Sequence, residues 1–550
     1  MKPSAPFSNN HYPVIIIGGG ITGIGILRDL SMRGIKALLV EQKDLCTGTS
    51  SHFHGLLHSG ARYAVSDGEA AKECMEENLI LKEIAPHAIE RTEGFFVSID
   101  GDEPAYAEKW VAGCAKAGIP TARVDLKTVV NLEPNLRGNM TAVYRVPDSA
   151  VDGFRLIWQN AYSAQSYGGV FRTYAAATAI HSENGAVTGI TITNILTGES
   201  ERISCDYLVN AAGSWVAAVA RLADIPIGIT PDRGLLIAFN YRFTERVINR
   251  LHPAGDADIF VPHGAITIFG TTSVKVENPA DTAVSSKEAL YMLNIGEKVF
   301  PELKSYRILR GFAGTRPLFS NGGGRDATRN FMVMDHENDG LKGFISIAGG
   351  KLTTYRLMAE KTSDLVCKKM GIDKPCRTRL EPLVKKIDKK VYKRARAYFP
   401  KLGIDLSISR QGDNFRNVLN RIASDKKKSA LLCECELVTR GEFEEVLFRS
   451  GNYPIEHLEL TLGTLSDVRR RTRIGMGTCQ GNFCAYRGVG TIAETGGVPD
   501  TDLSLILNKF IEERWAGIRP LLWGVQLKEA ELSRGIYQTI LNSAGEPYEE

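Results

Sequence analysis

The stretch HGLLHSGARY, residues 54–63, combines residue types that could do chemistry at close spacing. Two histidines and two glycines precede Arg62 and Tyr63. A histidine titrates near neutral pH and can take or give a proton, whereas an arginine keeps its charge and can bind an oxyanion with two parallel hydrogen bonds. The stretch predicts a loop that presents a proton-transfer group, His58, and a fixed cation to an anionic molecule.

A second group lies upstream, where Gly18, Gly20 and Gly23 have the G-x-G-x-x-G spacing. The first glycine permits a tight turn, the second lets a pyrophosphate approach the backbone, and the third lets a helix pack on a strand. Glu41 follows Gly23 by 18 residues, where a carboxylate can accept hydrogen bonds from ribose hydroxyls and disfavours a 2′-phosphate. This predicts FAD or NAD, rather than NADP, bound by Gly18, Gly19, Gly20, Ile21, Thr22, Gly23, Glu41 and Gln42.

Four of the ten cysteines form a third group. One residue lies between Cys433 and Cys435, four lie between Cys479 and Cys484, and 43 lie between the two pairs. Four thiolates can hold a [2Fe–2S] cluster or a structural zinc, although zinc ribbons prefer two residues between paired cysteines. The spacing disfavours zinc and leaves a cluster or thiols without metal as alternatives. The other six cysteines are scattered, and with no secretion signal we expect reduced thiols.

Three stretches can form the strands that position these groups. Val14–Ile17 and the ALLV run at 37–40 flank the glycines and the helix after them, as in a strand–helix–strand unit. Much later, DYLVNAAGSWV gives a strand that ends near Gly213, and GFISIAGGKLTTYRLMAE gives a strand, the Gly349–Gly350 turn and a helix. We expect the chain to return twice to the nucleotide domain and to bring a second helix N-terminus close to the cofactor.

The motifs HSGARY, GTRPL and GGKLTTYR together resemble the FAD-dependent glycerol-3-phosphate dehydrogenases. LCTGTSSHFHG, which includes Thr49 and Ser50, is similar to the segment that this family and the glycine oxidases run past the pyrophosphate toward the flavin. The resemblance covers nearly the whole chain except about 378–428. It implies an α/β fold: a Rossmann-type FAD-binding domain of the glutathione-reductase and DAO kind, interleaved with a mixed-sheet substrate domain, and a small helical cysteine domain.

The resemblance also implies roles for individual residues. The substrate phosphate would be held by Arg62, Tyr63, Arg316, Lys351 and Thr353. The flavin nucleotide would be held by the residues around the glycine motif together with Thr49, Ser50, His58, Gly213, Gly349, Gly350, Lys351 and Leu352. His58, Arg62 and Arg316 would be catalytic, with His58 as the leading candidate for the base that takes the hydroxyl proton. Aerobic family members place another histidine on a substrate-domain strand, whereas RGLLIAFNYRF has Asn240 and no histidine. That departure leaves the base in question.

The cysteine-bearing tail resembles that of the catalytic A-type chain in the anaerobic, multi-subunit members of this family. Its four cysteines resemble those of the bacterioferritin-associated ferredoxin domain, which implies a [2Fe–2S] cluster at Cys433, Cys435, Cys479 and Cys484. The implied partners are a flavin-bearing B subunit, with FMN at the interface, and a membrane-anchoring iron–sulfur C subunit. The chain would then lie at the cytoplasmic side of the inner membrane and pass electrons toward quinone.

These motifs suggest the following division of the chain. Residues 1–375 form the oxidoreductase, with FAD-binding segments at 12–65, 150–215 and 340–370 and substrate-binding segments at 70–150 and 215–340. A basic linker at 376–428, the cysteine domain at 429–490 and a helical segment at 491–550 follow. PDSAVDGFRL is expected to cross back to the FAD domain, with Asp152 capping a helix.

Composition sets broad limits on the function. The chain is 43% hydrophobic and 24% charged with a net charge of +4, which is typical of a globular protein. Residues 385–428 hold 14 Lys or Arg and 4 Asp, so this basic stretch carries +10 and the remainder −6. No apolar run is long enough to span a bilayer. A flavoenzyme for a 2-hydroxy acid or amino acid and a non-catalytic electron-transfer scaffold are the alternatives, but one carboxylate needs fewer cations than Arg62, Arg316 and Lys351 supply.

Overall fold

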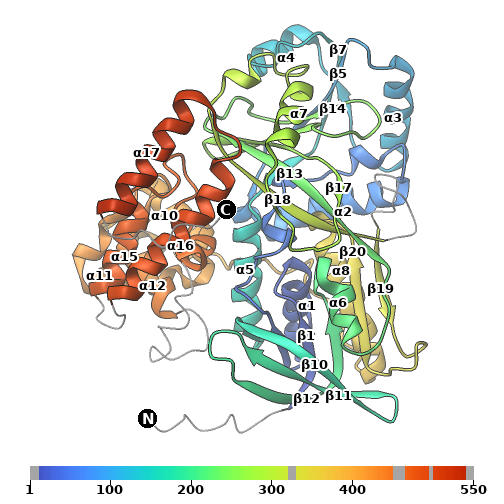
Figure 1. The fold of residues 1–550 in the computed structure, drawn as a ribbon. Helices are drawn as coiled ribbons and strands as arrows, with labels where there is room; N and C mark the ends of the chain where they lie inside the picture. The colour runs from blue at the N-terminus through green and yellow to red at the C-terminus, as the bar shows by residue number, and fades with distance from the viewer. Residues whose placement is uncertain (1–10, 320–329, 450–464, 495–499, 541–550) are drawn as a thin grey trace.

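The structure, a computed structural model, describes residues 11–319, 330–449, 465–494 and 500–540. Within these ranges most strands form two large sheets, and helices of the carboxyl-terminal part lie along one flank of both (Figure 1). The first sheet takes its strands from 11–40, 170–210 and 331–349, and the second from 94–146 and 229–319. The two sheets are therefore built from interleaved parts of the chain.

The centre of the first sheet is parallel, in the order β9, β2, β1, β12, β20. These strands are Val170–Arg172, Ala37–Val40, His11–Ile17, Ser200–Asn210 and Phe344–Gly349. Antiparallel β19 (Phe331–Asp335) closes one edge, and the hairpin of β10 (Ala175–Glu183) and β11 (Ala186–Asn194) extends from β12. This confirms the predicted Rossmann-type α/β fold.

Burial on both faces explains the apolar run in β1. Val14 and Ile16 pack under helices α1 (Ile21–Met32), α5 (Gly153–Ser166) and α8 (Tyr355–Met370). Ile15 and Ile17 pack on the other face, toward α6 (Val216–Arg221) and the β10–β11 hairpin. A central strand covered on both faces must be apolar at every position. Asp152 caps α5 as predicted, since its carboxylate accepts the N–H of Arg155 at 3.1 Å.

The second sheet is mixed and lies above the first in Figure 1. Its order is β18, β13, β16, β15, β14, β5, β7, β6, with β17 beside the start of β13. Its strands are Ile308–Phe319, Ile229–Phe239, Ile266–Gly270, Ile259–His263, Val247–Arg250, Gly94–Ile99, Met140–Val146, Ala122–Arg123 and Val274–Lys275. Helices α2 (Gly68–Ile84), α3 (Pro104–Lys116), α4 (Leu126–Leu132) and α7 (Ser286–Gly296) cover it. The segments expected to bind substrate supply these strands.

The basic stretch expected to be a linker is largely helical. It contains α9 (Lys389–Ala395), α10 (Lys401–Gln411) and α11 (Phe415–Ser424), which pack around a core of Ile404, Phe415 and Val418. The lysines therefore lie on the surface of a packed helical unit, as charged runs often do.

The cysteine domain follows this unit. It contains β21 (Leu431–Cys433), β22 (Val438–Thr439), α12 (Arg440–Arg449), α14 (Leu465–Thr472) and α15 (Cys484–Glu494). Helix α16 (Asp500–Ile518) contributes Leu507 and Phe510 to the same core, and α17 (Gly524–Ile540) follows it. In the described part of the chain, no helix has both the length and the apolar composition needed to cross a bilayer.

A buried ion pair joins the basic unit to the cysteine domain. Arg410 of α10 donates to both carboxylate oxygens of Glu442 at 2.7 and 2.8 Å, and both side chains are fully buried. The guanidinium also donates to the carbonyl of Glu436. A buried charge that keeps its fork of hydrogen bonds is tolerated, whereas an unpaired one is costly.

We predict that Glu442→Gln destabilises this unit by about 3–5 kcal/mol, because it leaves the Arg410 charge buried without a counter-charge. Urea unfolding of the wild type and of each variant measures the free energy of unfolding. Glu83→Gln, which removes an exposed pair with Arg91, is the matched control and should cost less than about 1 kcal/mol. Equal stability of the two variants would contradict the prediction.

Candidate active site

The turn between β1 and α1 leaves no room for side chains. Gly18 has a φ of +116°, and a Cβ on it would lie 2.6 Å from the carbonyl oxygen of Ala211. A Cβ on Gly23 would lie 2.0 Å from the carbonyl oxygen of Gly18. Gly20 gives α1 no side-chain cap, and although Ser50 occupies the N–H of Ile21, the rest of the first turn, from Thr22 on, can face an anion.

Glu41 lies at the carboxyl end of β2 and faces this turn. Its Oε2 accepts the N–H of Gly19 at 2.7 Å, and its Oε1 accepts the N–H of Lys43 at 2.9 Å. Burial raises the pKa of the Glu41 carboxyl, while these two amide hydrogen bonds oppose the rise. Each oxygen keeps a lone pair for a ribose hydroxyl. Gln42, also predicted to bind cofactor, is exposed.

The loop after β2 connects the glycine turn to the second sheet. Ser50 Oγ accepts the N–H of Ile21 at 3.1 Å. Thr49 Oγ1 donates to the carbonyl of Thr315 in β18 at 2.5 Å, and Ser214 donates to the same carbonyl at 2.6 Å. The predicted cofactor loop therefore holds β18 beside the first sheet.

The two later glycine motifs reach the same edge of the sheet. Gly213 follows β12 with a φ of +56°, and Gly349 and Gly350 end β20 with φ values of +80° and +74°. A helical turn, Leu352–Thr354, begins directly after Lys351 and leads into α8. The carboxyl ends of β1, β12 and β20 meet here, which is where doubly wound sheets bind ligands.

Four of the predicted site residues form one cluster. The backbone N–H of His58 donates to Thr353 Oγ1 at 3.1 Å. The His58 and Tyr63 rings stack with their centres 4.9 Å apart, and Lys351 Nζ lies 4.5 Å from the Tyr63 ring centre. His58 Nδ1 accepts the N–H of Gly60 at 3.2 Å, so the neutral ring carries its proton on Nε2. The structure thus joins HSGARY and GGKLT, which are almost 300 residues apart in the chain.

Each predicted phosphate-binding arginine is paired with a buried carboxylate that sequence reasoning missed. Arg62 donates to Asp258 Oδ2 at 2.7 Å and to the carbonyl of Gly255. Arg316 pairs with Asp232 and donates to Thr271 Oγ1 at 3.0 Å and to the carbonyl of Thr272 at 2.6 Å. These contacts fix the orientation of each guanidinium and neutralise part of its charge.

Both arginines contact the same end of the β15–β16 hairpin. Asp258 immediately precedes β15, and Thr271 follows β16, while Ala257 donates its N–H to the carbonyl of Thr271 at 3.0 Å. Asp258 also accepts a hydrogen bond from His252 at 2.8 Å. Although burial raises the pKa of Asp258, the bond from His252 and the charge of Arg62 bring it below its usual value. Asp258 is therefore a carboxylate at neutral pH.

The loop histidines His52 and His58 are held by different contacts. His52 packs on Gly314 of β18, with its Nδ1 2.9 Å from the carbonyl of Gly48, whereas His58 stacks on Tyr63. Burial lowers the pKa of His52 to about 4, so its ring is neutral. His54 Nδ1 accepts the N–H of Leu56.

The four tail cysteines lie together as two pairs. The Cys484 thiol donates to Cys433, and the Cys479 thiol to Cys435. The hydrogen bond from Cys484 lowers the pKa of Cys433 to about 7, with help from the N–H groups of Glu436 and Gly475. A Cβ on Gly477 would lie 2.3 Å from the Cβ of Cys435, so glycine is required there. Across the described residues, no three His, Cys, Asp or Glu side chains converge on a single ion position.

Arginines of α14 and of the turn after it attach the cysteine domain to the domain that contains the first sheet. Arg470 and Arg471 donate to the two oxygens of Asp44 at 3.2 and 2.7 Å, and Asp44 is fully buried in the loop after Glu41. Arg473 donates to Asp152 at 2.5 Å and to Glu436 at 3.0 Å. Glu436 directly follows Cys435, so Arg473 ties the cysteine site to the cap of α5.

Comparison with known proteins agrees with this arrangement. The model of the FAD dependent oxidoreductase family, DAO, matches residues 13–356. The chain belongs to the FAD-dependent oxidoreductase family. It is also 40% identical over 538 residues to the A subunit of the anaerobic glycerol-3-phosphate dehydrogenase of Escherichia coli K12, covering 96% of each chain. The A1 subunit of the enzyme of the same name from Haloferax volcanii is 39% identical over 97% of this chain and 91% of its own.

Solved structures of this family share the fold. The glycerol-3-phosphate dehydrogenase from Bacillus halodurans, complexed with FAD, matches with a TM-score of 0.69 at 22% identity, over 94% of this chain and 96% of that one. The glycine oxidase from Bacillus cereus matches with a TM-score of 0.54 at 20% identity, over 69% of this chain and 100% of its own. The second match leaves much of the chain without a counterpart.

The residues at the carboxyl edge fit the FAD that this family binds. The uncapped N-terminus of α1 and the bare backbone at Gly18 suit a pyrophosphate. Glu41 suits a ribose, and the second helix start after Gly350 suits negative charge on a reduced ring. The position where aerobic family members are expected to place a histidine, Asn240, lies just past the far end of β13. It is eight residues, or roughly 26 Å along the strand, from Asp232, which contacts Arg316.

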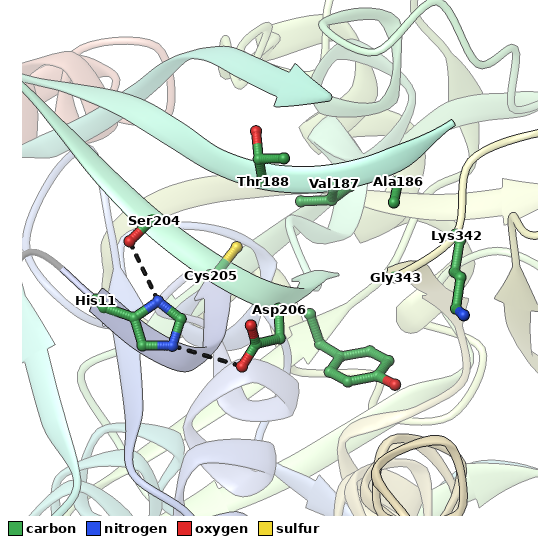
Figure 2. A pocket seen from close by; sticks show the side chains of 10 residues that line it. His11, Ala186, Val187, Thr188, Ser204, Cys205, Asp206, Lys342 and Gly343 are labelled. Carbon is green, nitrogen blue, oxygen red and sulfur yellow. Dashed lines mark hydrogen bonds and ion pairs between the residues drawn. The ribbon is translucent and has the colours of Figure 1, made fainter. Parts of the chain in front are cut away.

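A hollow of about 440 Å³ lies at the opposite edge of the first sheet (Figure 2). His11, at the start of β1, contacts Ser204 at 3.1 Å and Asp206 at 3.4 Å, and these side chains are largely exposed. Lys342 and Gly343, before β20, line the other side. This flavoprotein family binds its cofactor at the carboxyl ends of the strands, so the hollow at their amino ends is not the cofactor site.

We predict that Gly23→Ala lowers FAD affinity roughly 10- to 100-fold, since the new methyl group would overlap the Gly18 carbonyl and overpacking costs about 1–3 kcal/mol. The ratio of flavin to protein absorbance after gel filtration measures the loss. Gly68→Ala is the matched control, because a Cβ on Gly68 meets nothing within 4 Å. Equal flavin content in both variants would refute the prediction.

Proposed function

We propose that the chain oxidises sn-glycerol 3-phosphate to dihydroxyacetone phosphate, with FAD as the hydride acceptor. Relatives that match along 96% of the chain are named for this dehydrogenase. The observation that carries the proposal is the cluster of His58, Tyr63 and Lys351 at the cofactor edge. A titratable ring, a phenol and a cation suit a secondary alcohol that carries a phosphate.

The arginines supply the rest of the phosphate site. Arg62 donates a hydrogen bond from Nη2 to Asp258. Arg316 donates hydrogen bonds from both terminal nitrogens to residues that follow the β15–β16 hairpin, and it pairs with Asp232. Asp258 and Asp232 hold each guanidinium in place, so less rotamer freedom is lost when phosphate oxygens bind. Together with Lys351 these cations match a dianion better than a single carboxylate, which favours glycerol 3-phosphate over a 2-hydroxy acid or amino acid.

His58 orients the substrate and exchanges the hydroxyl proton. In the resting ring its Nε2 carries the proton and can donate to the substrate oxygen, while Nδ1 is occupied by the Gly60 N–H. To accept the hydroxyl proton at Nε2, the ring must first hold its own proton on Nδ1, which requires the hydrogen bond from the Gly60 N–H to break. FAD, when bound, would accept the hydride from carbon 2 while His58 takes the hydroxyl proton, so two electrons and two protons leave the substrate in all.

An anaerobic spectrum of the purified flavoprotein tests the reaction. Glycerol 3-phosphate should bleach the flavin band, whereas lactate and glycerol should leave it unchanged. Bleaching by lactate would favour the 2-hydroxy-acid alternative. No bleaching by any of the three, in protein with bound FAD and with the partner chains added, would leave only the scaffold alternative.

We predict that Arg62→Lys and Arg316→Lys each lower kcat/KM for glycerol 3-phosphate by roughly 10- to 100-fold, because a charge-assisted fork is worth about 1.5–3 kcal/mol. Lysine keeps the charge beside Asp258 and Asp232, so folding is preserved. Arg221→Lys, at an exposed position of α6, is the matched control. Steady-state kinetics at pH 7 measures the effect, and wild-type kinetics in both variants would rule out the phosphate assignment.

We further propose a [2Fe–2S] cluster at the four cysteines. Each iron of such a cluster takes two thiolates, which suits the two cysteine pairs better than one tetrahedral ion. The amides of Glu436, Gly475 and Gly481 bond to the sulfurs, as donors around such clusters do. A bound cluster would accept electrons singly from the flavin and pass them outward.

We predict that Cys479→Ser removes the visible and paramagnetic signal of the cluster but leaves FAD bound and reducible by glycerol 3-phosphate. The scattered, buried Cys205→Ser is the control and should keep both signals. Iron analysis and electron paramagnetic resonance of the reduced protein measure the outcome. Iron retained at wild-type stoichiometry in Cys479→Ser would contradict the assignment.

The partners and the location are a further part of the proposal. We propose a complex with a flavin-bearing B subunit, FMN at the interface and a membrane-anchoring iron–sulfur C subunit, which leads electrons to quinone at the cytoplasmic side of the inner membrane. Those relatives are named as one subunit of a larger enzyme, which supports partners. Val525, Leu532 and Ile536 on α17 are exposed apolar residues that a partner could cover. Co-purification of the three chains from membranes tests this.

A further inference from the structure

A buried carboxylate, Asp148, lies directly beside the loop that carries His58. The residue is 1% exposed and immediately precedes β8 (Ser149–Val151). Its Oδ1 accepts the backbone N–H of Ser59 at 2.7 Å, and the Ser59 hydroxyl also bonds to it. Because Thr353 accepts the N–H of His58, the peptide groups on both sides of the imidazole-bearing residue are held.

Other contacts hold the carbonyl groups of this loop. Asn78 of α2 donates to the carbonyl of Leu57 at 3.1 Å, and the indole of Trp110 on α3 donates to the carbonyl of Ala61 at 2.7 Å. Both donors are neutral side chains of helices that cover the second sheet. Asp148 differs from them because it accepts an amide of the loop and also contacts a strand of that sheet.

This second contact connects the loop with the hairpin that holds Arg62. Asn249 of β14 donates to Asp148 Oδ2 at 3.2 Å and pairs with Ile259, the residue after Asp258. Asp258 in turn accepts a hydrogen bond from Arg62 at 2.7 Å. The carboxylate therefore lies between the anchor of the proton-transfer group and the anchor of a phosphate-binding cation.

The surroundings leave this carboxylate little room to move. A Cβ on Gly94 of β5 would lie 2.7 Å from the Cβ of Asp148 and 3.0 Å from its Oδ2. Lys82 donates to the carbonyl of Pro147 at 2.6 Å, one residue before it. Burial raises the pKa of the Asp148 carboxyl, and the hydrogen bonds from Ser59, followed by the charge of Lys82, oppose that rise. A side chain packed this closely passes its own position on to the loop.

We propose that Asp148 is a positioning residue that sets where His58 lies relative to the phosphate-binding cations, an inference that rests on the proposed oxidation of glycerol 3-phosphate. When the Gly60 N–H releases His58 Nδ1, Asp148 and Thr353 still hold the two peptide groups next to the imidazole. A proton-transfer group must stay within hydrogen-bond reach of the hydroxyl, and a misplacement of about 1 Å can cost roughly 100-fold in rate.

Anaerobic stopped-flow reduction of the FAD-loaded chain by glycerol 3-phosphate tests the proposal. Asp148→Ala leaves two buried donors without their acceptor, so the limiting rate constant of flavin reduction should fall roughly 10- to 100-fold. The apparent Kd of glycerol 3-phosphate should change by less than about threefold, because Arg62 keeps its bonds to Asp258 and Gly255. Asp148→Glu keeps the carboxylate but moves it by one methylene group, and should slow reduction in the same way.

Asp148→Asn is the rescuing variant, and its rate should stay within about threefold of wild type. Its side-chain oxygen can accept the Ser59 N–H. Its amide can donate to Asn249 Oδ1, which has no partner within the described ranges, once that side chain turns over. The matched control is Glu133→Ala, which removes another buried carboxylate that accepts a backbone N–H, that of Glu245 at 3.0 Å. It should lower stability without slowing flavin reduction.

Amide hydrogen exchange provides a readout that needs no substrate. Residues 56–63 should exchange faster in Asp148→Ala than in wild type or Asp148→Asn. The proposal is overturned if they exchange as in wild type, if Asp148→Ala slows reduction no more than Glu133→Ala, or if Asp148→Asn is as slow as Asp148→Ala. An unchanged rate in Asp148→Glu overturns it even where the alanine variant does not fold. A wild type that glycerol 3-phosphate fails to reduce would instead overturn the proposed oxidation, and the exchange result would still decide whether Asp148 anchors the loop.

Discussion

The parallel pairing of β1 with β12 is the contact on which the rest of the site depends. Ile17 pairs with Asn210, and the N–H of Ala211 donates to the carbonyl of Ile17 at 2.9 Å. Backbone meets backbone there, so a side chain at Gly18 has no space. Because β20 pairs with the end of β12, the turn after Gly349 reaches the same edge and brings Lys351 and Thr353 to His58.

Local patterns in the sequence were enough to predict the cofactor domain. The glycine spacing, Glu41 and the Asp152 cap each depend on a few neighbouring residues, and the fold class and FAD family are confirmed. The partners of the arginines could not be predicted. Asp258 lies 196 residues after Arg62, and no periodicity links the two. Such long-range contacts depend on how the β15–β16 hairpin packs against the loop that carries Arg62. No pattern in the neighbouring sequence reports that packing.

Charge was the hardest feature to interpret from the sequence. The lysine-rich stretch predicted a linker, yet Ile404, Phe415 and Val418 give it a core, and Arg410 pairs with Glu442 inside the protein. Counting charges could not separate these buried arginines from the solvated lysines around them. Asp44 is similar, because nothing in the loop after Glu41 indicates that its carboxylate receives Arg470 and Arg471.

The attachment of the cysteine domain has a consequence for how charge moves through the molecule. Arg473 bridges Asp152 and Glu436, and Asp44 is fully buried under two arginines, so separating the domains would break several ion pairs at once. A tethered carrier that swings between donor and acceptor is incompatible with these bonds. An electron passing from the flavin edge to a cluster at the cysteines would therefore cross a fixed length of packed protein, and the rate of that transfer would be independent of solvent viscosity.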